Sequence, residues 1–352
     1  MNLFNKRTNE LQPYVVSSRI IDSKEDWLVL DWNESTSKIP NYLKETLNKF
    51  INRGELNLYG DVECIELKYN ISQILGIEES HLSFFNGSDS ALNICFESIL
   101  DEGDHVLTIE PEYSQVRTFI HMKGGVKIDF LLRSIEKPSI PELNESLKGK
   151  KIFYFSNPNN PIGFHFEKDE IENMLISNPN TMFFVDEAYY EFCESSAIDL
   201  VSKYSNLIIF RTFSKAFGLA GLRLGYIISN LNNIAVINKV RNGKEVSSIA
   251  QISATTALIH YDKIKNRIND LIEVRDWFYN ELKQLPNYTV FPSSANFLLV
   301  RHLNSQDVIS ALSRNKVLVR DRSTMHILEN CFRITIGSKG EMNRVLEILK
   351  KF

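Results

Sequence analysis

The chain of 352 residues contains few cysteines and no long apolar segment. Its four cysteines are scattered and form no C-x-x-C pair. Three of them have apolar neighbours, so we expect structural free thiols and neither disulfides nor a metal site. No stretch approaches the roughly 18 consecutive apolar residues of a membrane span, and the first residues hold no apolar segment of signal-peptide length. These absences predict a cytoplasmic protein with no membrane partner.

The chain also has no excess of charge of one sign. Forty basic and forty-four acidic side chains give a formal net charge of -4, without a basic block, so no nucleic-acid partner is expected. The absence of a G-x-G-x-x-G after a first strand argues against a nicotinamide dehydrogenase. The length exceeds what one core usually holds, which leaves room for two domains and a cleft between them.

Short apolar runs recur through the middle of the chain, separated by amphipathic segments of helical length. The runs are LSFF at 82, DHVLTIE at 104, KIFYF at 151, TMFFVDE at 181 and NLIIF at 206. Apolar strands that alternate with helices are typical of an α/β fold with a mostly parallel sheet covered on both faces. Ligands of such sheets bind beyond the carboxyl ends of the strands, where polar loops follow these runs.

The pattern divides the chain into three parts. Residues 1–45 show little periodicity and are predicted to form an arm that packs on the small domain or on a partner. Residues 46–230 contain the alternating strands and helices of a large, ligand-binding domain. From about residue 230 long helical patterns precede short strands, a helix and the segments KVLVRD and CFRITIG, which predicts a smaller α+β domain over 231–352.

A lysine, Lys215, follows the last of these apolar runs, with hydroxyls at Thr212 and Ser214 beside it. Such a lysine can simply end a strand and point into water. It can also be a desolvated amine that forms a Schiff base with a carbonyl. Asp186, at the end of TMFFVD, can hold a proton on a pyridine nitrogen or merely cap the next helix. Together with the polar loops, these residues supply the parts of a pyridoxal phosphate site.

Nine segments then resemble the fold-type I aminotransferases, and within them the histidinol-phosphate aminotransferase group. They occur in the family's order: LDWNES near 30, NLYGD at 57, NGSDSAL at 86, EPEYS at 110, SNPNNPIG at 156, VDEAYYEF at 185, RTFSKAFGLAGLRLGY at 211, FPSSANFLLV at 291 and CFRITIGS at 331. The resemblance covers nearly the whole chain. It implies a large domain with a mostly parallel sheet, a smaller α+β domain and pyridoxal 5'-phosphate as the cofactor.

The resemblance also implies roles for single residues. Lys215 would carry the cofactor and move a proton at the substrate Cα, and Asp186 would hold the ring nitrogen. Asn160 and Tyr189 would donate to the cofactor's phenolate oxygen, although Asn160 could be a turn residue. Tyr113 would stack on the ring, unless it is an ordinary core tyrosine. The phosphate would lie in a cup formed by Gly87, Ser88, Asp89, Thr212, Ser214 and Arg223.

Within this cup, Asp89 is expected to be a helix N-cap whose carboxylate accepts from the backbone and turns away from the ligand. Arg333, in FRITIG, resembles the arginine that binds the substrate α-carboxylate. A surface strand arginine is the alternative, and the apolar neighbours that alternate with Arg333 argue against it. Arg320 would read a phosphorylated side chain, with a surface arginine as the alternative. Tyr59 resembles a tyrosine that reaches the cofactor phosphate of a neighbouring subunit, and packing in a hinge is its alternative.

The resemblance implies a homodimeric transaminase with shared sites that acts on small-molecule donors and acceptors, with glutamate as the expected donor. Decarboxylation of a phosphoamino acid is the alternative reaction. The segment VRNGKEVSS departs from an aromatic, proline-containing stretch of the group and weakens the expectation of imidazole recognition. Its cations Arg241 and Lys244, together with Arg320, predict a small phosphorylated or otherwise anionic acceptor.

Overall fold

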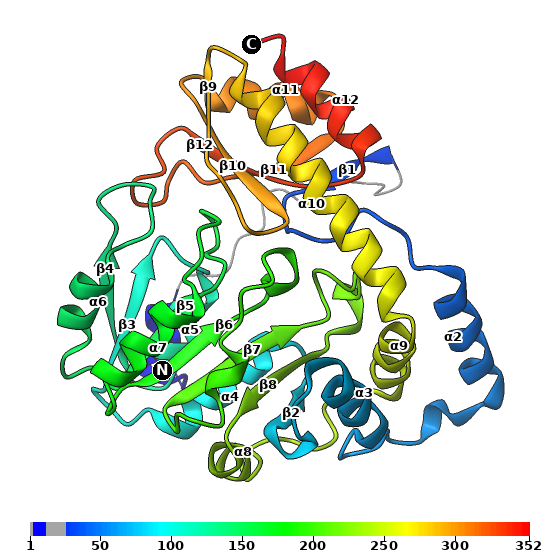
Figure 1. Ribbon diagram of the computed structural model, residues 1–352, viewed down its shortest axis with the longest axis vertical. Helices are drawn as coiled ribbons and strands as arrows, with labels where there is room; N and C mark the ends of the chain where they lie inside the picture. The colour runs from blue at the N-terminus through cyan, green and yellow to red at the C-terminus, as the bar shows by residue number, and fades with distance from the viewer. Residues whose placement is uncertain (1–2, 12–25) are drawn as a thin grey trace.

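The computed structural model describes residues 3–11 and 26–352. Within these residues the larger sheet has seven strands in the order β2-β8-β7-β6-β5-β3-β4. All of them run parallel except β8, which is antiparallel to β2 and β7 (Figure 1). This confirms the predicted fold class. The strand bounds are Leu82–Phe85 (β2), His105–Glu110 (β3), Val126–Leu131 (β4), Ile152–Ser156 (β5), Met182–Asp186 (β6), Leu207–Thr212 (β7) and Gly225–Ser229 (β8).

Successive side chains of the central strands enter two separate cores. In β6, Phe183 and Val185 belong to one cluster and Phe184 to the other. Because both faces are buried, these strands are continuously apolar in sequence. One face is covered by α4 (Ser88–Ile99), α5 (Gln115–Met122) and α8 (Leu231–Ile237). The other is covered by α6 (Ile140–Leu147), α7 (Lys168–Ser177) and α9 (Ser248–Ile259), with α2 (Asn41–Arg53) and α3 (Ile65–Leu75) packed on α9.

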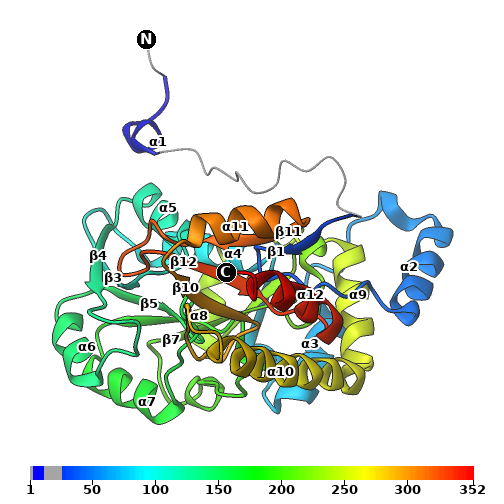
Figure 2. The same ribbon diagram turned by 90° about the horizontal axis from the view of Figure 1, so that it is seen from above.

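The smaller sheet has the order β1-β11-β12-β10-β9 within the described residues. Its core is shared with helices that lie over it in Figure 2. The long helix α10 contacts α9 at the large sheet and β9 at the small one, so it bridges the two. The bounds are Leu28–Leu30 (β1), Tyr261–Lys283 (α10), Tyr288–Val290 (β9), Phe297–His302 (β10), Ser305–Arg314 (α11), Val317–Asp321 (β11), Cys331–Thr335 (β12) and Lys339–Leu349 (α12).

The predicted arm contributes to both parts of the molecule. Its strand β1 pairs in parallel with β11, and its short helix α1 (Lys6–Glu10) contacts α5. Residues 12–25 of the arm lie outside the described residues. The helices α8 and α9 follow residue 230 yet pack on the large sheet, and the division at residues 45 and 230 remains our proposal. None of the described helices combines the length and apolarity that crossing a membrane needs.

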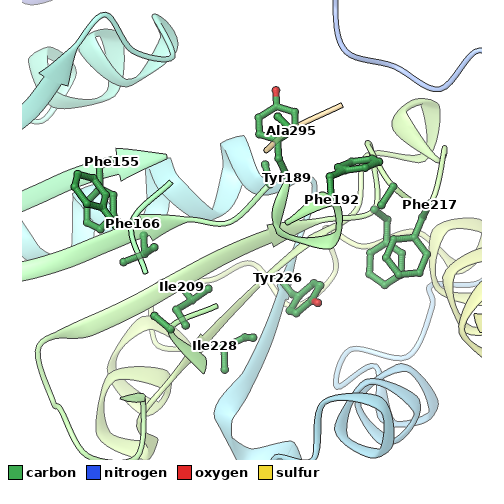
Figure 3. Packing of buried hydrophobic residues seen from close by; sticks show 14 of the residues in the cluster. Phe155, Phe166, Tyr189, Phe192, Ile209, Phe217, Tyr226, Ile228 and Ala295 are labelled. Atoms are coloured by element: carbon green, nitrogen blue, oxygen red, sulfur yellow. The ribbon is translucent and has the colours of Figure 1, made fainter. Parts of the chain in front are cut away.

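One buried cluster joins the large sheet to the small one (Figure 3). It contains Phe155 and Tyr226 of the large sheet and extends to Ala295, next to β10. Tyr189, in the loop after β6, belongs to this cluster and lies edge-on to Phe297 at 5.4 Å between ring centroids. The loop after β6 is therefore held where the carboxyl ends of the parallel strands face the small sheet.

Candidate active site

A cleft of about 740 Å³ lies between the two sheets. Its walls come from the carboxyl ends of β5, β6 and β7, the start of α4, the loop between β3 and α5, the segment after β1, and β11 and β12. Another hollow, of about 830 Å³ over β4 and α6, contains none of the predicted site residues. The predicted residues that line the cleft are Ser88, Asp89, Tyr113, Asn160, Asp186, Tyr189, Thr212, Ser214, Lys215, Arg223, Arg320 and Arg333.

Lys215 follows β7 and points its amine into the cleft. The side chain is half-buried, and Nζ donates a hydrogen bond of 2.9 Å to the carbonyl oxygen of Trp32. Trp32 belongs to the segment after β1, so this bond spans the two sheets. The alternative that Lys215 only ends a strand and points into water does not fit this position.

Asp186 is the last residue of β6 and is buried. Its Oδ2 accepts a hydrogen bond of 2.9 Å from the phenol of Tyr154, and Oδ1 accepts one of 3.2 Å from the Ala188 N–H. Burial raises the pKa of Asp186 to about 6, against the two hydrogen bonds, which lower it. The next helical turn begins after Tyr189 and receives no side-chain cap. A helix-capping role therefore does not account for Asp186.

Tyr189 and Asn160 meet at the side of the cleft nearest the small sheet. The amide nitrogen of Asn33 donates to the Tyr189 hydroxyl at 2.9 Å, and that of Asn160 lies 3.5 Å from the same oxygen. The turn role that sequence allowed for Asn160 falls instead to Asn159, whose Oδ1 accepts from the Ile162 N–H at 3.1 Å. The Asn160 side chain is thus directed into the cleft.

The predicted phosphate cup is formed where β2 leads into α4. Gly87 has φ +84° and precedes the helix, so its backbone conformation suits glycine alone. A Cβ at Gly87 would lie 2.7 Å from Nη2 of Arg223, and one at Gly225 would lie 2.4 Å from the Ser88 nitrogen. Both glycines let the guanidinium and strand β8 approach the helix N-terminus closely. Backbone N–H groups and an arginine there favour an anion.

The prediction that Asp89 is an N-cap turned away from the cleft is wrong. Gly87 takes the N-cap position, and Asp89 lies inside the first turn of α4. Its Oδ1 accepts from the Tyr113 hydroxyl at 2.9 Å, and its Oδ2 lies 3.2 Å from Nη2 of Arg223. A residue with helical backbone angles directs its side chain outward, so Asp89 positions Tyr113 and Arg223 at the cleft. After β7, the Thr212 hydroxyl donates a hydrogen bond of 2.9 Å to the Ser214 hydroxyl.

Arginines converge on the cleft from the small sheet. Arg333 is buried in β12, and its Nη1 donates to Asn160 Oδ1 at 2.5 Å and its Nη2 to the Asp31 carbonyl at 2.7 Å. Arg320 of β11 lies directly opposite Arg333 in the antiparallel register. Arg322, which sequence reasoning did not select, also lines the cleft. Its spacing of two residues from Arg320 was the available signal, because alternate residues of a strand share a face.

Sequence reasoning missed two further residues. Asn33 has φ +58°; its N–H donates to Thr335 Oγ1 at 3.0 Å, and its side chain orients Tyr189. Its place in LDWNES, near the small sheet, gave no hint of that contact. Glu112, within EPEYS, is a buried carboxyl on the cleft wall. The sequence prediction selected its neighbour Tyr113 from the same segment.

Three predicted residues lie outside the cleft of their own chain. Tyr59 is 77% exposed, with the Lys244 ammonium 4.8 Å from its ring centroid. The guanidinium of Arg241 contacts the Val62 carbonyl at 3.3 Å and approaches Glu63. The expectation that Arg241 and Lys244 add cations to the pocket is therefore not met within one chain. The position of Tyr59 is compatible with a role in a neighbouring subunit, which stays a prediction.

Comparisons with known proteins agree with this geometry. The sequence profile of the aminotransferase class I and II family matches residues 25–349. The chain is 36% identical over 356 residues to a dihydroxyacetone phosphate transaminase of Campylobacter jejuni, covering 99% of this chain and 96% of that protein. It is 34% identical over 323 residues to a histidinol-phosphate aminotransferase of Ruminiclostridium cellulolyticum, covering 90% of each.

A solved structure extends the comparison to the fold. The histidinol-phosphate aminotransferase of Sinorhizobium meliloti in complex with pyridoxal 5'-phosphate superposes with a TM-score of 0.89 at 22% identity. The match covers 100% of this chain and 97% of that one. The chain therefore belongs to the class I and II aminotransferases, enzymes of fold type I, and is a transaminase that depends on pyridoxal 5'-phosphate.

Proposed function

We propose that this transaminase moves an amino group from glutamate to a small phosphorylated carbonyl compound. The observation that carries the proposal is the pair Arg320 and Arg333, which face each other across β11 and β12 and both line the cleft. Two cationic residues on neighbouring strands make this wall of the cleft suited to anionic groups of a substrate. The carboxylates of glutamate and the phosphate of the acceptor are both such groups, since each binds arginine in a fork.

The residues present fit pyridoxal phosphate. Asp186 supplies a buried carboxylate, Lys215 an amine, and the loop before α4 an anion cup that Gly87 and Gly225 keep open to Arg223. When bound, the cofactor supplies an electron sink for the pair left behind as the substrate Cα loses its proton. Asp186 is suited to hold a proton at the ring nitrogen, and Asn160 and Tyr189 to donate to the phenolate oxygen.

The remaining steps belong to side chains of this chain. Lys215 is positioned to take the proton from the substrate Cα and to return it to the cofactor carbon, because its amine points into the cleft. Arg333 would bind the α-carboxylate and so orient the Cα bonds. Its bond to Asn160 fixes the guanidinium beside the group that would contact the cofactor's phenolate oxygen. Proton transfer and substrate orientation are then coupled through one rigid set of residues.

Arg320 and Arg322 would serve the distal end of both substrates. A phosphate carries up to two negative charges and has more acceptor oxygens than one guanidinium can bind. The γ-carboxylate of glutamate can use the same arginines in the other half reaction. The Campylobacter jejuni relative is named for dihydroxyacetone phosphate, a three-carbon phosphorylated carbonyl compound. That name supports a small phosphorylated acceptor.

The proposal includes a homodimer located in the cytoplasm. Exposed apolar side chains gather on the segment that precedes and begins α3, which favours a covering partner. They are Leu56 (60% exposed), Leu58 (62%), Tyr59 (77%), Ile65 (62%) and Tyr69 (54%). Tyr59 would reach the cofactor phosphate of the partner. The four cysteines carry free thiols, as is usual in a reducing compartment.

A single-turnover experiment tests the proposal. The enzyme is first converted to its amino form with glutamate, and candidate carbonyl compounds are then added one at a time, each with and without its phosphate group. The return of the aldehyde spectrum is followed. We expect glutamate to produce the conversion and phosphorylated acceptors to reverse it faster than dephosphorylated ones. Equal rates for the two would contradict the acceptor class, and release of CO2 from a phosphoamino acid would favour the decarboxylase alternative.

A further inference from the structure

The loop after β7 that carries Lys215, residues 213–219, depends on a distant helix for part of its hydrogen bonding. Within the loop, the Gly218 N–H donates to the Lys215 carbonyl at 3.1 Å. The carbonyl of Ala216 takes no part in this turn, and Ala216 is 2% exposed. A buried backbone carbonyl needs a hydrogen-bond donor. The donor for Ala216 must therefore come from outside the turn.

That donor is Arg267 of α10. Its Nη2 donates to the Ala216 carbonyl at 2.5 Å. A Cβ placed on Gly218, whose φ is +68°, would lie 3.7 Å from Nη1 of Arg267, so the guanidinium lies against a second part of the loop. The first residue of α10, Tyr261, faces the ring of Phe217, which is labelled in Figure 3, with 6.3 Å between ring centroids. The loop is thus docked on α10 at more than one point.

The charge of Arg267 is not balanced by an ion pair within the described part of the chain. Its Nε is shielded from solvent and has no hydrogen-bond partner there. Burial lowers the pKa of Arg267, because a guanidinium loses favourable hydration when it is buried. An apolar side chain would pack α10 on the loop without this cost. The bond to the Ala216 carbonyl is therefore the contact that gives the guanidinium a role.

The Ala216 carbonyl adjoins the residue that is proposed to move the substrate proton. The amine of Lys215 is held by the Trp32 carbonyl at 2.9 Å, and the backbone after Lys215 is held by Arg267. The first contact comes from the segment after β1, and the second comes from the helix that bridges the two sheets. A small displacement of a group that transfers a proton lowers the rate steeply. The position of Lys215 thus depends on both contacts.

We propose that Arg267 is a positioning residue that acts through the Ala216 carbonyl and holds Lys215 where its amine reaches the reacting atoms. This inference rests on the proposed role of Lys215. Arg267 itself does not line the cleft, so it acts only through the loop. The alternative is that Arg267 merely packs α10 on the large domain.

Four variants separate these roles. Arg267→Met removes the donors and keeps a long side chain. Arg267→Gln is a shorter, uncharged polar replacement that gives a second reading if Arg267→Met does not fold. Arg267→Lys restores a charged donor. Arg275→Met is the matched control, roughly two turns further along α10. The Nη1 of Arg275 donates to the carbonyls of Phe192 at 3.3 Å and Ala295 at 3.1 Å, which lie outside the lysine loop.

Three measurements are made on the full chain. Urea unfolding gives the free energy of unfolding of each variant. The apoenzyme is then mixed with pyridoxal 5'-phosphate, and the growth of the visible band that borohydride removes reports how fast Lys215 reacts. Glutamate with hydrogen or deuterium at Cα is finally added to each holoenzyme. The isotope effect on its conversion reports how far proton transfer limits the rate.

We expect Arg267→Met and Arg267→Gln to form the visible band and to convert with glutamate roughly 10- to 100-fold more slowly than the parent. Their isotope effect should be larger, because proton transfer becomes slower than the other steps. Arg267→Lys should recover most of both rates. Arg275→Met should lower the free energy of unfolding and keep the parent rates and isotope effect.

Parent-like band formation and isotope effect in Arg267→Met and Arg267→Gln would overturn the inference, and so would equal losses in Arg275→Met. Failure of the proposed function gives different results. If glutamate does not convert the parent enzyme, the proposed donor is wrong, and the rate of band formation decides the role of Arg267. A reduced adduct on another lysine would reject the proposed role of Lys215, and with it the inference.

Discussion

The guanidinium of Arg333 donates a hydrogen bond of 2.5 Å to the side-chain oxygen of Asn160. The two residues are 173 positions apart and belong to different sheets, Arg333 to β12 and Asn160 to the loop after β5. This bond joins the residue proposed to bind the substrate carboxylate to a residue proposed to bind the cofactor. A shift of the small sheet would therefore change substrate and cofactor contacts together.

Replacement of Lys215 tests the covalent attachment of the cofactor. We expect borohydride to remove the visible band of the parent enzyme and to leave the cofactor on a single peptide that contains Lys215. Lys215→Ala should bind the cofactor without a reducible linkage and lose essentially all turnover, because Lys215 is the only lysine among the described residues that line the cleft. Mass spectrometry of digested protein makes the measurement. A reduced adduct on another lysine would refute the assignment.

Asp186→Asn should bind the cofactor but lose most of its rate. An amide cannot balance a positive ring nitrogen, so we expect a loss of roughly 2–4 kcal/mol in transition-state stabilisation, seen as a lower kcat/KM. Tyr154→Phe is the milder companion, because it removes one hydrogen bond to Asp186 and leaves the carboxylate. Its expected loss is smaller than that of Asp186→Asn. Parent-like turnover in both variants would assign Asp186 a structural role only.

We expect ionisation of Glu191 to lower the free energy of unfolding as the pH rises. It is buried, and burial raises its pKa from 4.5 to about 8 although the Arg211 charge lowers it. The folded state thus holds the proton more tightly than the unfolded state, so the Glu191 contribution to stability falls between about pH 4.5 and 8. Glu191→Gln should match the parent near pH 4.5 and exceed it by roughly 1–3 kcal/mol above pH 8.

Urea unfolding at both pH values measures this difference in the free energy of unfolding. Glu194→Gln is the control, because Glu194 is an exposed residue of the same loop. That substitution should leave the pH dependence unchanged. A parent-like pH slope in Glu191→Gln would mean that Glu191 remains ionised in the folded protein.

The sequence predicted those parts of the fold that rest on local pattern. The five apolar runs all became strands, because strands buried on both faces must be apolar throughout. Two strands of the large sheet were not predicted. β4 is an edge strand with side chains that are partly or largely exposed, and β8 follows the lysine loop within the segment RTFSKAFGLAGLRLGY, which was interpreted for its lysine and arginine. In both cases the apolar signal was weak or masked by another one.

The site was predictable where a residue's role follows from its own segment. Lys215 and Asp186 stand at strand ends, and strand ends meet in one place. Asn33 and Arg322 depend on pairing between distant segments, which periodicity within one segment does not reveal. Asp89 was misjudged because its neighbour Gly87, at positive φ, takes the cap position. Glu112 was missed because the burial of a single carboxyl at the cleft wall is not evident from sequence.

Tyr59 tests whether two subunits share their sites. We expect Tyr59→Ala to weaken cofactor binding, because the partner's phosphate loses a hydrogen-bond donor. Mixing it with Lys215→Ala under conditions that exchange subunits should restore about a quarter of the parent activity, since half of the dimers then hold one intact site. Leu303→Ala, at an exposed apolar residue outside that segment, is the control and should not show this loss. No recovery on mixing, or a fully active monomer, would contradict shared sites.

Arg320 tests how the acceptor is recognised. Its guanidinium lines the cleft opposite Arg333, so removing it should affect the distal group of the substrate and spare the α-carboxylate. We expect Arg320→Ala to lower kcat/KM for a phosphorylated acceptor by roughly 10- to 100-fold, as loss of a charge-assisted hydrogen bond predicts. The dephosphorylated acceptor should change little. The ratio of the two kcat/KM values is the measurement, because it cancels any general loss of active enzyme.

Variants of other arginines show whether the effect is specific to Arg320. Arg333→Ala should lower kcat/KM for glutamate most, because Arg333 is proposed to bind its α-carboxylate, and should leave the ratio between phosphorylated and dephosphorylated acceptors unchanged. Arg314→Ala, an exposed arginine at the end of α11, should change neither value. If Arg320→Ala leaves the preference for phosphate intact while Arg322→Ala abolishes it, the phosphate is bound by Arg322. If neither changes it, the cleft does not read a phosphate through β11, and the acceptor is a carbonyl compound of another class.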